Sequence, residues 1–260
     1  MRIVIKVGTS TLSHPTGRLD IRHVEMLVKV LSDLKNAGHE LILVSSGAIG
    51  MGVGRLNLPC RPSDIPTKQA AAAVGQCALM DTYDRLFSQY NHTVAQILLT
   101  GEDIEHSDRR TNFENTVNRL LELGVLPVIN ENDSVATAEI RVGDNDTLAA
   151  IVACAVKAEL LILLSDIDGL FSADPHKDTT AARIPVVERI TPEIEALAAG
   201  AGSALGTGGM TTKLHAAKLV MENGCDMVIA NGGDPDCLYD ILRGADIGTR
   251  FCGRKTYDDQ

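Results

Sequence analysis

Short apolar runs alternate with segments of helical spacing along most of this chain. The runs at 2–7, 41–44, 93–99, 125–130, 160–164 and 227–230 are rich in Val, Ile and Leu, as strands buried on both faces of a sheet are. The clearest helical pattern runs from Ile21 to Leu34, with Asp20 placed to cap it and Gly38 to end it. This repeated βα pattern predicts an α/β fold with an open, mostly parallel sheet and helices on both faces.

Caps, prolines and glycines predict the remaining boundaries. Three prolines make 55–66 a loop, and Thr67 is expected to cap an Ala-rich helix that runs to about Tyr90. Further helices are expected at 107–123, 147–157, 192–199, 211–223 and 235–243, a small β excursion at 136–142, and an edge strand at 248–252. No internal repeat or linker divides the chain, so one compact unit is expected.

Composition narrows the classes of function. Only 3% of the residues are aromatic and Trp is absent, so the core must be aliphatic, which suits a buried parallel sheet. The formal net charge is −10, and Lys and Arg form no cluster of the kind that binds nucleic acid or an anionic membrane. Any anionic substrate must therefore be held by a local positive site.

Neither a membrane span nor a secretion signal is recognisable in the sequence. Apolar runs stay below the ~18 residues of a transmembrane helix. The apolar N-terminus contains Lys6 and is typical of a first strand rather than of a signal peptide, so a cytoplasmic location is expected. The six cysteines are widely scattered, with no C-x-x-C pair and no His at ligand spacing, and we expect no metal site among them.

Polar clusters follow four of the predicted strands, at 8–10, 45–47, 130–133 and 165–166. Ligands of open α/β sheets bind at the carboxyl ends of the strands, which is where these clusters fall. The stretch 130–146 is the richest, with three Asp, two Glu and three Asn. We interpret it as a loop that holds a small polar ligand, and we assign no role to Glu131, Glu139 or Arg141.

Two segments carry positive charge or free backbone amides toward such a ligand. Lys6 lies inside an apolar strand just before Gly8, where it either contacts a phosphate or extends from an edge strand into solvent. The glycine-rich segment 206–213 leads into a helix and ends in Lys213, so it is either an anion-binding turn or a solvated glycine linker. It lacks the spacing of a Walker loop.

Other catalytic or binding patterns are weak. The glycines at 50, 52 and 54 do not keep the dinucleotide-binding register, and they fit a ligand-facing turn or a packing turn equally well. The 144–146 segment lacks the spacing of a calcium loop, and no G-x-S-x-G elbow accompanies the histidines. An NAD-dependent oxidoreductase and a hydrolase triad are therefore disfavoured.

Five motifs, in order, resemble those of the amino acid kinase family. They are IKVGTS at 5–10, VSSGAI at 44–49, VINENDSVATAEIRVGDNDTLAA at 128–150, LLSDIDGLFSADP at 163–175 and GTGGMTTKLHAA at 206–217. The two longest, the third and the fourth, are similar to its glutamate-phosphorylating branch rather than to the kinases of acetylglutamate, aspartate, carbamate or uridylate. The resemblance implies a three-layer α/β/α sandwich and transfer of the ATP γ-phosphoryl group to the γ-carboxylate of L-glutamate, the first step toward proline.

The resemblance also assigns roles to individual residues. Lys6 and Lys213 would contact the transferred phosphoryl group, and Asp146 would orient both lysines. Glutamate would be held by Ser46, Asp133 and Asn145, with Gly47, Asn130 and Asp144 close by. ATP would be bound by Lys6, Gly8, Ser165, Asp166, Thr207, Gly208, Gly209, Met210, Thr211, Thr212 and Lys213, with Mg²⁺ bridging its phosphates and no separate protein metal site.

This chemistry agrees with the residue types. A carboxylate nucleophile is already ionised at neutral pH, so no general base is needed, and the site must instead neutralise and align two anions. A non-catalytic amino-acid or nucleotide sensor on the same fold is the alternative. It would need no pair of lysines with an aligning carboxylate.

The resemblance carries further expectations about organisation and partners. Residues 1–159 would form the amino-acid-binding part and 160–260 the nucleotide-binding part of a single domain. A homo-oligomer, a dimer or tetramer, is expected, and feedback inhibition by proline is a hypothesis. Family members often carry a C-terminal RNA-modification-like domain, which we expect to be absent here because the sequence ends at Gln260.

Overall fold

A computed structural model describes residues 1–14, 18–136, 144–175, 178, 180–200 and 209–253. Within them one sheet of eight strands has the order β3-β4-β2-β1-β5-β7-β8-β6, and only the β7–β8 pair is antiparallel. The strands are β1 (Arg2–Val7), β2 (Glu40–Ser45), β3 (Val94–Leu99), β4 (Leu126–Glu131), β5 (Leu160–Ser165), β6 (Val186–Val187), β7 (Asp226–Asn231) and β8 (Thr249–Phe251). The mostly parallel α/β fold predicted from the sequence is confirmed.

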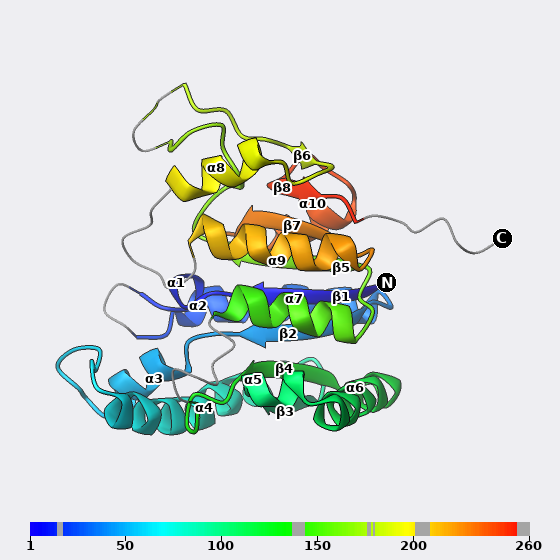
Figure 1. The fold of residues 1–260 in the computed structure, drawn as a ribbon. Helices are drawn as coiled ribbons and strands as arrows, with labels where there is room; N and C mark the ends of the chain where they lie inside the picture. Colours follow the sequence, from blue (N-terminus) through cyan, green and yellow to red (C-terminus); the bar gives the residue numbers. More distant parts are fainter. Residues whose placement is uncertain (15–17, 137–143, 176–177, 179, 201–208, 254–260) are drawn as a thin grey trace.

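Helices cover both faces of the sheet (Figure 1). They are α1 (Thr9–Leu12), α2 (Ile21–Asn36), α3 (Ala48–Arg55), α4 (Ile65–Ser88), α5 (Gly101–Glu105), α6 (Ser107–Glu122), α7 (Asn145–Ala155), α8 (Pro192–Gly200), α9 (Met210–Glu222) and α10 (Cys237–Leu242). Among them, no helix is long and apolar enough to cross a bilayer.

The two faces of β1 separate two cores. Ile3 and Ile5 pack with side chains of α2, α4 and α10, whereas Val4 packs with side chains of α6, α7 and α9. Successive residues of a strand point to opposite faces, so Lys6 shares the face of Val4. Lys6 therefore lies under α7 and α9, which run side by side across that face in Figure 1.

The glycines at 50, 52 and 54 lie inside helix α3 rather than in a turn, so the turn prediction is wrong. A Cβ on Gly52 would lie 1.8 Å from the carbonyl oxygen of Ala71, and one on Gly75 would lie 1.7 Å from that of Ala48. Gly52 and Gly75 therefore let the backbones of α3 and α4 touch, so of the three glycines in α3 it is Gly52 that serves this packing.

Two helix starts and the place of one strand in the sheet also differ from prediction. Asp64, not Thr67, caps α4, since its side chain accepts from the backbone N–H of Thr67. Helix α7 begins at Asn145 because Asp144 caps it. Strand β8 lies between β7 and β6 rather than at the edge. The predicted β excursion lies outside the described residues from Thr137 onward.

Candidate active site

Four parallel strands bring the predicted polar clusters to one edge of the sheet. β4, β2, β1 and β5 are adjacent, and Val7 pairs with Ser45 on one side and with Leu164 on the other. The segments that follow these strands therefore meet at their shared carboxyl ends. This edge is the usual ligand position of open α/β sheets.

Two lysines converge on Asp146 at this edge. Lys6 Nζ lies 2.6 Å from Asp146 Oδ1, and Lys213 Nζ lies 3.0 Å from Asp146 Oδ2. The hydroxyl of Thr212 donates to Asp146 Oδ2 at 3.1 Å. Lys6 comes from β1, Asp146 from the first turn of α7 and Lys213 from the first turn of α9, so the cluster joins three elements distant in sequence.

The cluster is buried and carries a net positive charge. Lys6, Asp146 and Lys213 are 8%, 1% and 3% exposed. Burial raises the pKa of Asp146, but the charges of Lys6 and Lys213 outweigh it and hold that pKa below its usual value. By formal charge, two lysines and one carboxylate leave one excess positive charge, which suits the cluster to a phosphoryl group.

The residues predicted to bind ATP lie around this cluster where the structure describes them. A Cβ on Gly8 would lie 3.6 Å from Lys6 Nζ, which places that glycine beside the ammonium group. Gly209 caps α9, whose first residues are Met210, buried, and Thr211, exposed. Thr207 and Gly208 lie outside the described residues.

Ser165 and Asp166 continue the same edge at the end of β5. The hydroxyl of Ser165 donates to Asp166 Oδ1 at 3.0 Å, and the side chain of Asp166 is exposed. Because β5 neighbours β1, these two residues lie one strand away from Lys6. Their role in binding ATP stays a prediction.

Three residues predicted to hold the amino acid are linked by hydrogen bonds. Asn145 Nδ2 donates to Ser46 Oγ at 2.6 Å and to Asn130 Oδ1 at 3.1 Å. Gly47 follows Ser46 with a φ of 103°, a left-handed conformation that favours glycine, and it caps α3. These contacts join β2, β4 and α7 at the strand ends.

Asp144 is engaged in capping α7. Its Oδ1 accepts from the backbone N–H groups of Asp146 and Thr147, and its Oδ2 accepts from the hydroxyl of Thr147. Such a cap stabilises a helix start by about 0.5–2 kcal/mol. Asp144 therefore fixes the turn that presents Asn145 and Asp146.

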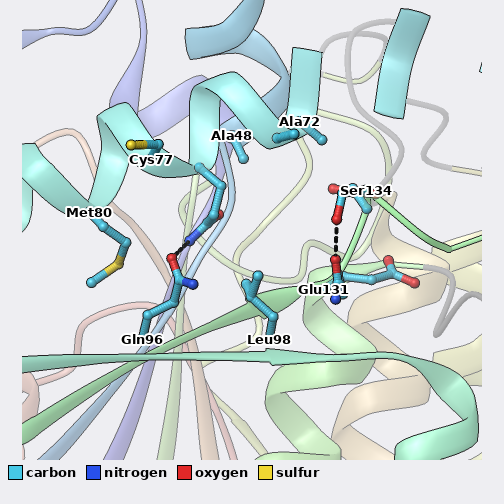
Figure 2. A pocket seen from close by; sticks show the side chains of 12 residues that line it. Ala48, Ala72, Cys77, Met80, Gln96, Leu98, Glu131 and Ser134 are labelled. Atoms are coloured by element: carbon cyan, nitrogen blue, oxygen red, sulfur yellow. Dashed lines mark hydrogen bonds between the residues drawn. The ribbon is translucent and has the colours of Figure 1, made fainter. Parts of the chain in front are cut away.

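Asp133 lies on the wall of a cavity of about 440 Å³ between α4 and the ends of β3 and β4. Figure 2 shows Glu131 and Ser134 on one side of this cavity and Cys77 and Met80 of α4 on the other. Glu131 is buried, whereas Glu139 and Arg141 lie outside the described residues. No group of three or more His, Cys, Asp or Glu side chains suited to a metal occurs in the described part of the chain.

One contributor to this region was not predicted. Gln76 of α4 accepts a hydrogen bond from Asn130 Nδ2 at 3.0 Å, and it is 8% exposed. Its position is readable from spacing, because it falls on the stripe formed by Ala72, Leu79 and Tyr83, at helical intervals of three and four. A Gln on a buried helix stripe needs hydrogen-bonding partners, and that signal points to a polar site.

Known proteins resemble the chain in sequence and in fold. The sequence model of the amino acid kinase family matches residues 1–231. Glutamate 5-kinase of Clostridium perfringens is 52% identical over 258 residues, covering 98% of this chain and 96% of that protein. Glutamate 5-kinase of Carboxydothermus hydrogenoformans is 53% identical over 255 residues, covering 98% of this chain and 68% of that protein.

Solved structures share the fold at low sequence identity. A carbamate kinase from Giardia lamblia bound to AMP-PNP superposes with a TM-score of 0.70 at 15% identity, covering 97% of this chain and 98% of that chain. An isopentenyl phosphate kinase superposes with a TM-score of 0.67 at 19% identity, covering 96% of this chain and 100% of that chain. With a family match over residues 1–231 and relatives more than half identical across nearly its whole length, this chain belongs to the amino acid kinase family.

Proposed function

We propose that this chain transfers the γ-phosphoryl group of ATP to the γ-carboxylate of L-glutamate, the first step of proline biosynthesis. The observation that carries the proposal is the buried cluster in which Lys6 and Lys213 flank Asp146. This cluster lies next to the hydrogen-bonded group of Ser46, Asn130 and Asn145. The two groups are adjacent because Asn145 and Asp146 are consecutive residues of α7. The relatives named glutamate 5-kinase at more than 50% identity support this choice of substrate.

In this proposal the two lysines neutralise charge and the carboxylate aligns them. A glutamate carboxylate and a triphosphate repel each other, so the principal requirements are positive charge and in-line positioning. Lys6 and Lys213 supply the charge, and Asp146 fixes where their ammonium groups lie. Both carboxylate oxygens of Asp146 face lysines, so we do not propose Asp146 as a ligand of Mg²⁺; Mg²⁺ bound together with ATP would supply further charge neutralisation.

Recognition of the amino acid is assigned to the other half of the edge. Ser46, Asn130, Asp133 and Asn145 offer the hydroxyl, amide and carboxylate groups that an α-ammonium and an α-carboxylate require. A site built for a free ammonium should reject an N-acylated substrate, because its acceptor would lose its partner. We assign the amino acid to residues 1–159 and the nucleotide to residues 160–260.

ATP-dependent formation of a hydroxamate from L-glutamate and hydroxylamine tests the activity directly, because hydroxylamine traps an acyl phosphate. Parallel reactions with N-acetylglutamate and aspartate serve as controls, and we expect product from glutamate alone. Product from a control and none from glutamate would move the assignment to another carboxylate kinase. Binding of glutamate and ATP without turnover would indicate a sensor instead.

Two further proposals rest on the family alone. We propose a homo-oligomer, which sedimentation velocity would test, with a purely monomeric protein as the contrary result. We also propose inhibition by proline, tested by adding proline to the hydroxamate reaction. A cytoplasmic location stays a prediction from the sequence.

A further inference from the structure

A line of side-chain amides connects helix α4 to the residues assigned to the amino acid. Asn145 Nδ2 donates to both Ser46 Oγ and Asn130 Oδ1, and Asn130 Nδ2 donates to Gln76 Oε1 at 3.0 Å. We call Gln76, Asn130, Asn145 and Ser46 the amide relay. At its outer end Gln76 Nε2 donates to Gln96 Oε1 at 3.2 Å, the bond drawn as a dashed line from Gln96 in Figure 2.

The main chain of β4 fixes the direction of the relay. The backbone N–H of Glu131 points at Asn130 at 2.9 Å, and a backbone N–H can only donate. The Asn130 atom facing it must therefore be Oδ1, which leaves Nδ2 to face α4. It follows that the atom of Gln76 facing Asn130 is its acceptor, Oε1, and that the atom of Asn145 facing Asn130 is its donor, Nδ2.

This direction determines what the relay offers to a ligand. Both hydrogens of Asn145 Nδ2 are used by Asn130 and Ser46, so the side-chain atom left for a ligand is the acceptor Oδ1. The hydroxyl of Ser46 accepts from Asn145, so its own hydrogen is left to donate. One acceptor beside one donor matches the ammonium and carboxylate of a free amino acid.

We propose that Gln76 is a positioning residue that acts through Asn130 to hold Asn145 and Ser46 in the orientation that binds the amino acid. The inference rests on the proposed function and adds a determinant of substrate affinity from α4. Asn130 is 2% exposed, so without an acceptor at position 76 its Nδ2 group would be buried and unsatisfied. The Asn130 side chain would then turn to find another acceptor, and Asn145 would lose the partner that fixes its amide.

Two substitutions at Gln76 separate positioning from packing. Gln76→Met keeps the length of the side chain and removes the amide oxygen. Gln76→Glu keeps an oxygen that accepts from Asn130 Nδ2, whether ionised or protonated. The exposed amide of Gln96 can rotate to donate to that carboxyl group. Gln89→Met, at the exposed C-terminal end of α4, is the matched control for the same chemical change on the same helix.

The measurement is the KM for L-glutamate and for ATP in the hydroxamate reaction, with melting temperature recorded for each variant. We expect Gln76→Met to raise the KM for L-glutamate about tenfold or more, the effect of about 1.4 kcal/mol in binding. The KM for ATP should stay within about twofold. Gln76→Glu should restore the KM for L-glutamate to within about threefold of the unmodified chain.

Contrary results are well defined. A folded Gln76→Met protein with an unchanged KM for L-glutamate, or with equal losses for both substrates, would overturn the proposal. If the Met variant does not fold, the Glu variant decides, and a tenfold rise in its KM for L-glutamate refutes the positioning role. If the unmodified chain phosphorylates a different amino acid, the proposed function fails, and the same comparison with that amino acid tests Gln76 separately.

Discussion

Replacing Asp146 by Asn removes the carboxylate that faces both Lys6 and Lys213. At an effective dielectric constant of about 20, its attraction to each lysine is about 5–6 kcal/mol at separations of 2.6 and 3.0 Å. Desolvation of three buried charges offsets much of that attraction, and removing one partner of such a cluster costs about 3–5 kcal/mol. Domains have about 5–15 kcal/mol of stability, so Asp146→Asn should fold with a clearly lowered melting temperature.

Activity should fall together with stability. Without the carboxylate the two ammonium groups repel each other and lose their alignment, and a misplaced transition-state contact typically costs about 10²–10³ in kcat. The hydroxamate reaction should be run at a temperature where circular dichroism shows the variant folded. Asp64→Asn is the control, because Asn caps α4 as well as Asp does while removing the same charge. A folded Asp146→Asn protein with kcat within threefold of the unmodified chain would refute the aligning role.

Three shorter predictions address phosphoryl transfer, packing and thiol chemistry. Lys213→Ala should abolish turnover, while L-glutamate should still raise the melting temperature of the variant. The control is Lys218→Ala, which should retain turnover because the surface ion pair of Lys218 with α8 contributes little to stability. Normal turnover in Lys213→Ala would contradict the role of Lys213. Gly75→Ala should lower the stability by about 1–3 kcal/mol or more, because the added methyl group forces α3 away from α4. Gly54→Ala is the control and should be neutral or stabilising, because Gly54 has open space around it. Equal melting temperatures of the two variants would refute the close approach of the α3 and α4 backbones. Burial raises the pKa of the Cys225 thiol to about 12. At pH 8 Cys225 should therefore react with a disulfide reagent much more slowly than the exposed Cys60 and Cys77. Equal reaction rates would contradict its burial.

The fold was predictable because its signals are local and repeated. Each central strand is a short aliphatic run, and each long helix has a stripe of apolar residues, so type and order follow from periodicity. The errors come from tertiary contacts that periodicity does not contain. Glycine is a poor helix former, so the glycines of α3 predict a turn, yet the close approach of Ala71 in α4 requires Gly52 within that helix. Asp64 and Thr67 are both good caps, and only the structure selects between them.

The charged residues of the candidate site could be predicted from the sequence, but the hydrogen bonds between residues distant in sequence could not. Motif resemblance pointed to Lys6, Asp146 and Lys213, and the structure brings their charged groups together. The motif resemblance could not identify Gln76, because a single amide side chain within an Ala-rich helix belongs to none of the motifs. The hydrogen bond from Asn130 crosses 54 positions in the sequence, and such a pairing depends on how α4 packs on the sheet.

The first turn of α7 explains why two different chemistries meet at one edge. Asn145 and Asp146 are consecutive, and consecutive residues of a helix point about 100° apart. One side chain therefore reaches Ser46 and Asn130 while the next reaches Lys6 and Lys213. Because Asp144 caps this turn, a single rigid helix start sets the distance between the amino-acid side and the phosphoryl side. In-line transfer requires such a fixed distance, so Asp144 should matter for kcat although its carboxylate is occupied by the cap.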